Sequence, residues 1–271
     1  MTREEAEEAV LRLAADGDFE AACQVAADTW RLWLTAGDVE GGRRVLGAAL
    51  EGSGPSSRAR ALALYGDGVL AFRAGDQEGS RARNEEALGV ARSSGDAEAE
   101  SLALVGLSRV ALRDHDYDRV RRLAAEAREI AQPVGPAAEM MPLHLLAAGT
   151  RLDGGLDDAV ELYTESLELN RSIGDGYMVA VEHHNLGHVE LHRGNVDAAE
   201  RHFADRVRAL GESSAYDVAM SVLNEAALAF AGGRREQAAE LVESAEAALA
   251  EAGIALDPDD EFEVEWLRAR L

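Results

Sequence analysis

One short pattern returns at near-constant spacing along the chain, and it constrains the fold more than any other feature. A small residue, usually glycine, is followed by a polar position, a bulkier position, an acid and then small residues. From position 75 onward the pattern recurs after steps of 40, 39, 40 and 39 residues. A fixed period of this size predicts stacked copies of one supersecondary unit. The pattern begins at Gly17, Gly37, Gly75, His115, Gly154, Gly194 and Gly233.

A second break lies midway between these turns, at Gly95, Gly135, Gly174 and, with a looser fit, Gly211. Each interval between breaks holds about 15–20 residues whose apolar positions lie three and four apart, which is the pattern of an amphipathic helix. Asp or Asn at the start of an interval and Gly at its end suit helix caps. Each unit of about 40 residues is therefore predicted to be two antiparallel helices, and stacking the pairs builds a shared core.

The residues within one unit resemble the signature of a tetratricopeptide repeat (TPR), in a longer form of about 40 residues per repeat. Two units depart from it, with Asp67 and Glu225 at a position where leucine is usual. The resemblance implies an all-α fold, a right-handed TPR-like α-solenoid of antiparallel helix pairs. The matching residues are Leu186, Gly187, Gly194, Ala199 and Phe203 in one unit, and Leu146, Ala147, Gly154, Ala159 and Tyr163 in the unit before it.

The resemblance also implies one continuous domain. Residues 1–55 would form an N-terminal helical capping segment, 56–253 about five helix pairs, and 254–271 a C-terminal capping helix. In the first segment, Trp30 and Trp33 are expected in the core, with an interface as the alternative. In the last, Phe262 and Trp266 lie four apart and are expected to dock over the last repeat, although a partner surface is the alternative.

The stretch from 183 to 203 is especially similar to the helical-repeat regions of large actinobacterial ATP-dependent transcriptional regulators. Those proteins also carry an ATPase, but this chain contains no lysine and therefore no GxxxxGK[ST] phosphate-binding loop. No basic recognition helix is visible either. The sequence therefore looks like the repeat module alone, in a regulatory or scaffolding context.

The charge balance argues against two classes of partner. All 27 basic residues are arginine against 51 acids, which gives a net charge of −24 and opposes binding to nucleic acid or to an anionic membrane. No apolar run approaches the roughly 20 residues that cross a bilayer, and the first residues have no signal-peptide core. With a single cysteine, Cys23, there is no intrachain disulfide, and we expect a cytoplasmic protein.

In such a solenoid the first helix of each pair lines the concave side, and its outward face is the predicted binding groove. This face contains arginines, histidines and apolar residues but no Asp or Glu, whereas acidic runs such as REEAEEA and DPDDEFEVE are expected on solvated faces and at a helix N-terminus. The predicted groove residues are Tyr65, Arg73, Arg109, Arg113, His144, Arg151, His184, Asn185, His188 and His192.

Three of the histidines share one helix face. His184, His188 and His192 are four residues apart, whereas His183 points toward a neighbouring helix. A zinc site would need further ligands that the sequence does not place nearby, so we predict no metal and no cofactor. The other interpretations are a solvated polar face, a ligand-contacting groove and a catalytic role.

These observations favour a non-catalytic module that binds a protein or peptide with an acidic or carboxylate-bearing segment. Asn185 matches one position with which TPR relatives grip a C-terminal carboxylate, although the lysines of that clamp are absent. The alternative is a small-molecule or signal-peptide sensor that closes around its ligand. We do not expect an enzyme, because no Ser/His/Asp set, zinc-protease helix or paired acid motif is legible.

Overall fold

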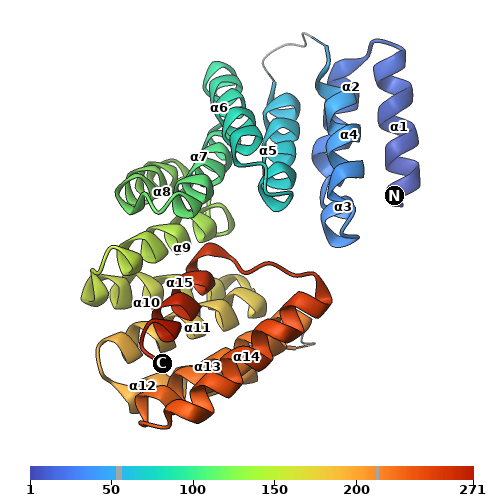
Figure 1. The fold of residues 1–271 in the computed structure, drawn as a ribbon. Coiled ribbons are helices and arrows are strands. Elements are labelled where there is room, and N and C mark those ends of the chain that lie inside the picture. Colours follow the sequence, from blue (N-terminus) through green and yellow to red (C-terminus); the bar gives the residue numbers. More distant parts are fainter. Residues whose placement is uncertain (53–56, 212–213) are drawn as a thin grey trace. The chain divides into compact units, whose positions relative to one another are not determined.

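The computed structural model describes residues 1–52, 57–211 and 214–271, and all regular secondary structure in these ranges is helical (Figure 1). The predicted all-α fold is therefore confirmed. The chain forms two compact units, residues 1–145 and 146–271. Within the described ranges, no helix combines the length and apolar character needed to cross a membrane. The predicted boundary between residues 55 and 56 lies outside the described residues, and the three-segment division of the chain stays a prediction.

Unit 1, residues 1–145, begins with four helices and continues with longer helix pairs. The helix α5 packs on α6, and α7 packs on α8. The helices are α1 (Arg3–Ala15), α2 (Phe19–Thr29), α3 (Arg31–Thr35), α4 (Val39–Leu50), α5 (Arg58–Arg73), α6 (Gln77–Ser94), α7 (Ala97–Arg113) and α8 (Tyr117–Ala131).

Unit 2, residues 146–271, contains the last turns of α9 and six further helices. The pairs α11 with α12 and α13 with α14 pack closely, and the last helix contacts α13. The helices are α9 (Pro136–Leu152), α10 (Leu156–Ile173), α11 (Gly176–His192), α12 (Val196–Ala209), α13 (Ala215–Ala231), α14 (Arg235–Ala252) and α15 (Pro258–Arg268).

The turns predicted from the repeat adopt a left-handed backbone. All seven positions that begin the pattern have φ between 57° and 90°. Glycine occupies six of them because it enters this region without a steric penalty. His115, with φ 57°, is the non-glycine exception among the described residues. Gly95, Gly135 and Gly174 at the second break also have positive φ, so the punctuation in the sequence marks real helix ends.

Glycine inside the helices allows close approach between the members of a pair. A Cβ added to Gly187 on α11 would lie 2.2 Å from the ring of Phe203 on α12. Phe203 is buried, so the ring has little room to withdraw. These two residues are the glycine and the aromatic of the TPR-like signature, and their contact explains why that spacing accompanies this helix pair.

We expect Gly187→Ala to lower the free energy of unfolding of unit 2 by about 1–3 kcal/mol, the usual effect of overpacking a core. The matched control is Gly89→Ala on α6, where an added Cβ has nothing within 4 Å. That change should instead stabilise its helix by about 0.5–1 kcal/mol, because alanine restricts the unfolded chain. Native-state hydrogen exchange measures both effects, and equal effects of the two substitutions would contradict the packing argument.

The core of unit 1 includes both tryptophans of its N-terminal segment. Trp30 and Trp33 are buried with Leu46, Leu64 and Leu70. The structure thus assigns Trp30 and Trp33 to the core rather than to an exposed interface.

Asp67, which stands at the unusual leucine position of α5, is also buried in unit 1. Its carboxylate accepts a hydrogen bond from Arg83 Nε at 2.7 Å and lies 3.5 Å from Arg43 Nε. A buried carboxylate requires such partners. The departure from the repeat signature is therefore accompanied by two arginines from the neighbouring helices α4 and α6.

Candidate functional site

The ten predicted groove residues divide evenly between the two compact units. In unit 1, Tyr65 is buried and its hydroxyl accepts a long hydrogen bond of 3.4 Å from Arg109 Nη1. The guanidinium of Arg113 lies 4.9 Å from the ring centre of Phe72. Arg73 is exposed, whereas Arg109, Arg113 and His144 are half-buried. Arg113 therefore lies against an aromatic ring, whose negative face attracts the cation, whereas Arg109 contacts the hydroxyl of Tyr65.

In unit 2, four of the predicted residues form one cluster, which we name the Arg/His face: Arg151 of α9 with His184, His188 and His192 of α11. This face is not open. The C-terminal helix α15 lies on it, and side chains of α15 bind all four residues. Figure 1 shows α15, in red, drawn against α11.

Glu263 of α15 binds three members of the Arg/His face. Arg151 Nη1 donates to Glu263 Oε1 at 2.8 Å, and His192 Nε2 lies 2.8 Å from Glu263 Oε2. His188 Nδ1 lies 3.3 Å from the same oxygen. Burial raises the pKa of the Glu263 carboxyl, but the fields of His188 and Arg151 outweigh this effect and bring the pKa well below its usual range. Glu263 is therefore an ionised group held inside the protein.

Asp260, one turn earlier on α15, binds the fourth member. His184 Nε2 donates to Asp260 Oδ1 at 2.8 Å, and the hydroxyl of Tyr216 on α13 donates to Oδ2. Burial lowers the pKa of His184 to about 4, so the ring is neutral at pH 7. Burial raises the pKa of Asp260, but His184 and Tyr216 lower it by more, to about 2. The pair is therefore a carboxylate bound by a neutral imidazole.

The contact between α15 and the rest of unit 2 also has an apolar side. Val264 and Leu267 are buried in a cluster with Met220 and Leu223 of α13. The ring of Trp266 lies edge-on to His192 at 4.6 Å between ring centres. A pocket that opens to solvent remains beneath the helix, with a cavity volume of about 20 Å³. Besides the three histidines, it is lined by Leu191, Met220, Leu223, Ala227, Asp260, Glu263, Val264, Trp266 and Leu267.

One sequence expectation needs correction here. The acids of DPDDEFEVE were expected on a solvated face and at a helix N-terminus. Asp260 does lie in the first turn of α15, but Asp260 and Glu263 are only 9% and 7% exposed, so the solvated face is wrong for these two residues. They are buried because Arg151 and the histidines need partners in a site that excludes water. The amide nitrogen of Asn185 donates to Val181 O of its own helix at 3.2 Å, and its place in the binding groove stays a prediction.

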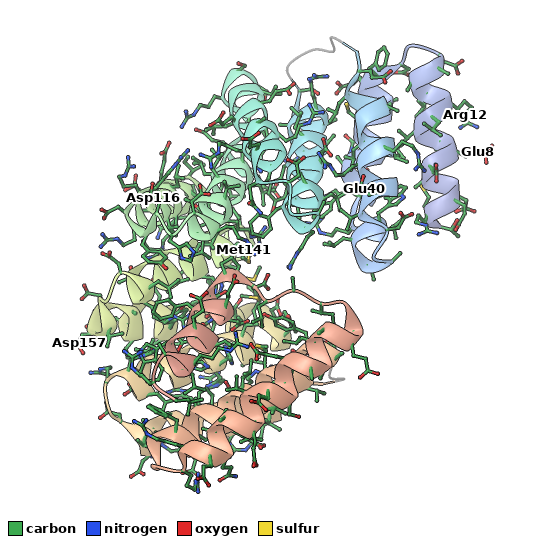
Figure 2. The ribbon with its side chains drawn as sticks, in the orientation of Figure 1. Glu8, Arg12, Glu40, Asp116, Met141 and Asp157 are labelled. Carbon is green, nitrogen blue, oxygen red and sulfur yellow. The ribbon has the colours of Figure 1, made fainter. Side chains whose placement is uncertain are left out.

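Other expectations about the charges agree with the structure. His183 contacts His202 of α12 and Arg171 of α10, away from the Arg/His face. The acids of the first run are mostly exposed, and Figure 2 shows Glu8 on the outside of α1, as well as Asp157 at the start of α10. Three members of the cluster were not predicted from the sequence: Asp260, Glu263 and Tyr216. The available signal was that Asp260, Glu263 and Leu267 lie three and four apart, on one side of a helix.

Comparison with known proteins defines the fold. No protein-family model matches the chain, and no curated protein is similar to it in sequence. Solved structures are similar over most of its length. One is a Rap protein complexed with competence and sporulation factor, with 14% identity over 92% of this chain and 68% of that chain and a TM-score of 0.69. Another is a TPR protein from Parabacteroides merdae, with 12% identity over 98% of each chain and a TM-score of 0.60.

The similarity extends to a multidomain ATPase. The Pyrococcus horikoshii signal transduction ATPase with numerous domains, which has a tetratricopeptide repeat sensor, is 15% identical over 92% of this chain, with a TM-score of 0.61. The match spans 41% of that protein. This chain consists of TPR-like helical repeats. At these identities the similarity shows the TPR-like fold, in agreement with the signature residues around Gly187 and Phe203.

The described TPR-like helices show no arrangement of three or more His, Cys, Asp or Glu side chains able to hold a metal ion. The Nε2 atoms of His184 and His192 contact carboxylates, and Nε2 of His188 lies 3.0 Å from the amide oxygen of Asn224. Cys23 is buried with its thiol 3.3 Å from Ala49 O, and burial raises its pKa to about 11. At pH 7 it is a thiol, which is a weak nucleophile.

We expect acidification to weaken the docking of α15. His184 faces Asp260 of α15, His188 of its own helix and Arg206 of α12. Its pKa is about 4 when buried and about 6.5 when exposed, so the undocked state binds more protons between these values. Docking stability from His184 is therefore complete above pH 6.5 and falls by about 2 kcal/mol between pH 7 and 5. Asp260 and Glu263 also stabilise the docked helix, because their pKa values are lower when docked than when exposed. This stabilisation is lost only as the pH falls below about 4.5.

The measurement is the indole NMR signal of Trp266, which should move toward its position in a free α15 peptide as the pH falls from 7 to 5. In His184→Gln the amide can still donate to Asp260 but does not titrate. This control should flatten the pH dependence over the same interval. An equally steep change in His184→Gln would show that another group is responsible.

Proposed function

We propose that this chain is a non-catalytic, regulatory or scaffolding module that binds a protein or peptide through an acidic or carboxylate-bearing segment. The binding residues would be the Arg/His face in unit 2 and the predicted set of unit 1, Tyr65, Arg73, Arg109, Arg113 and His144. The observation that carries the proposal is that the Arg/His face already holds an acidic helix, with Glu263 and Asp260 at 2.8 Å from their partners.

The comparisons support a peptide as the partner. The Rap structure contains competence and sporulation factor, and NprR, which is 14% identical with a TM-score of 0.64 over 99% of this chain, was solved with its cognate peptide NprX. By analogy with these proteins we place this chain among peptide-responsive regulators. A net charge of −24 makes nucleic acid an unfavourable partner, since its phosphates would be repelled.

Unit 1 supplies cations for the same kind of ligand. Arg109 and Arg113 are one turn apart on α7, and both are half-buried. Arginine pairs with carboxylates through two parallel hydrogen bonds, which gives direction as well as attraction. An acidic segment would gain these hydrogen bonds. Arg113 already lies over the ring of Phe72 and Arg109 already contacts Tyr65, so the segment would not need to displace apolar side chains to reach the two arginines.

The test is a panel of 15-residue amphipathic peptides with acidic residues at positions three apart, together with matched peptides that carry Asn and Gln instead. Acidic peptides should bind the full chain, and binding should weaken at least tenfold between about 50 and 500 mM salt. Arg109→Glu with Arg113→Glu should weaken it further. The control is Arg12→Glu with Arg44→Glu; Figure 2 shows Arg12 on the outside of α1. Equal binding of acidic and neutral peptides would contradict the proposal.

The pocket beneath α15 favours a second candidate function, a small-molecule or signal-peptide sensor. Its walls combine apolar side chains with convergent polar groups from His184, Asp260 and Glu263, which is typical of ligand sites. A metabolite pool that raises the melting temperature of the wild type but not of His184→Ala would support this function. The absence of any shift across the pool would leave only the peptide proposal.

A further inference from the structure

The helix α15 binds the other helices of unit 2 as a separate ligand would. It follows α14 after a non-helical stretch at residues 254–257, and then returns to α9, α11 and α13. Its contacts reach residues far away in sequence: Arg151 and Glu263 are 112 positions apart, and His184 and Asp260 are 76 apart. The helix is therefore not a member of the repeated pairs, in which partners follow one another along the chain.

The acidic and the apolar residues through which α15 contacts its neighbours lie on one side of the helix. Asp260 and Glu263 face the Arg/His face, and Val264 and Leu267 enter the apolar cluster of α13 and α14. The opposite side, with Glu261, Glu265 and Arg268, is exposed. An amphipathic helix that lies in a groove shows the same pattern, with its contact residues three, four and seven positions apart.

The polar contact is incompletely satisfied. Arg151 Nε and His184 Nδ1 are buried without a hydrogen-bond partner, and buried unpaired polar atoms reduce stability. Buried ion pairs gain little over apolar packing because both charges lose their hydration. The pocket beneath the helix further reduces its packing contacts. These features limit the stability of the α15 contact, which is also less extensive than the contacts within the helix pairs, so α15 should be the easier helix to release.

We propose that the Arg/His face, with the apolar cluster beside it, is a binding site for an acidic amphipathic helix of the form Asp-x-x-Glu-apolar-x-x-apolar, and that α15 is the built-in competitor for this site. The inference rests on the proposed function and names its partner class and its control. A partner helix with this pattern would displace α15 and take over its contacts with Arg151, His184, His188 and His192.

Tethering determines how strongly α15 competes. A short linker gives a local concentration of the order of 1 mM. If the isolated helix bound with a Kd of about 10 μM, tethered α15 would weaken an external helix of the same sequence about 100-fold. A partner must therefore bind more tightly than α15 in order to displace it.

The test uses a fluorescent peptide of residues 257–271, DPDDEFEVEWLRARL, and the full chain. Val264→Asp places a carboxylate in the apolar cluster and should release α15 from the protein. We expect the peptide to bind Val264→Asp at least tenfold more tightly than the wild type. The same peptide with Asn and Gln in place of Asp260 and Glu263 should bind at least tenfold more weakly. Equal affinity of the two proteins, or of the two peptides, would overturn the inference.

Val264→Asp could unfold more of the protein than α15 alone. Hydrogen exchange on the wild type tests the inference without this substitution. The amides of α15 should exchange at least tenfold faster than those of α11 and α13, because the helix opens separately. Exchange of α15 together with α11 would overturn the inference. Failure of the proposed function looks different: the 257–271 peptide would bind Val264→Asp, but no acidic peptide of the panel would bind any form of the protein.

Discussion

Replacing Arg151 with leucine should lower the free energy of unfolding of unit 2 by about 3–5 kcal/mol, the usual effect of removing one partner from a buried ion pair. Arg151 is 3% exposed and its Nη1 donates to Glu263 at 2.8 Å. Without the guanidinium, Glu263 is left with only the histidines of the Arg/His face. We expect the loss to appear as faster amide exchange in α15 first, since this helix carries Glu263.

A double-mutant cycle separates the ion pair from the lost packing. Arg151→Leu with Glu263→Leu removes both charges, so the double variant should be more stable than the sum of the single effects by about 1–3 kcal/mol. Arg44→Leu is the control, because Arg44 is 65% exposed in its pair with Glu7 at 2.9 Å and such pairs contribute about 0–1 kcal/mol. Additive single effects would show that Arg151 and Glu263 are not coupled.

The second large effect is expected for Phe203→Ala, at about 3–5 kcal/mol. Phe203 is buried, and its ring packs where Gly187 leaves space. The ring centre also lies 5.1 Å from that of His188 and 6.3 Å from that of His184. Loss of the ring therefore leaves a cavity in the helix pair and removes the support behind two histidines of the Arg/His face.

Val207→Ala provides the matched control on the same helix. Val207 is 59% exposed, so its truncation should change the free energy of unfolding by less than about 0.5 kcal/mol. Exchange of the α11 and α12 amides reports both variants. If Phe203→Ala behaved like Val207→Ala, the contact between Phe203 and Gly187 could not be what holds this helix pair together.

Local regularity made the fold readable from the sequence. Each turn needs a residue that tolerates positive φ, so glycine recurs at a fixed step, and even the exception at His115 keeps the left-handed backbone. The aromatic at Phe203 appears where the glycine at Gly187 makes room for it. The positive φ at each turn and the close contact between paired helices both involve residues near one another in sequence. They therefore produce a pattern that repeats along the chain.

Only the cationic half of the site could be predicted from the sequence, and the reason is physical. The cationic half was visible because Arg151, His184, His188 and His192 occur at regular positions of first helices. The acidic half lies in α15, outside the repeats, and carboxylates three apart on a helix are usually solvated. Nothing local to Glu263 shows that Arg151 lies 112 positions away along the chain and 2.8 Å away in space.

The most direct measurement of the central claim is the ring NMR spectrum of His184, His188 and His192 in the full chain. In Val264→Asp their signals should leave the wild-type positions, because α15 no longer covers them. Addition of the 257–271 peptide should return the signals to those positions, since the peptide restores the carboxylates of Asp260 and Glu263. Histidine signals that stay unchanged on addition of saturating peptide would contradict the account.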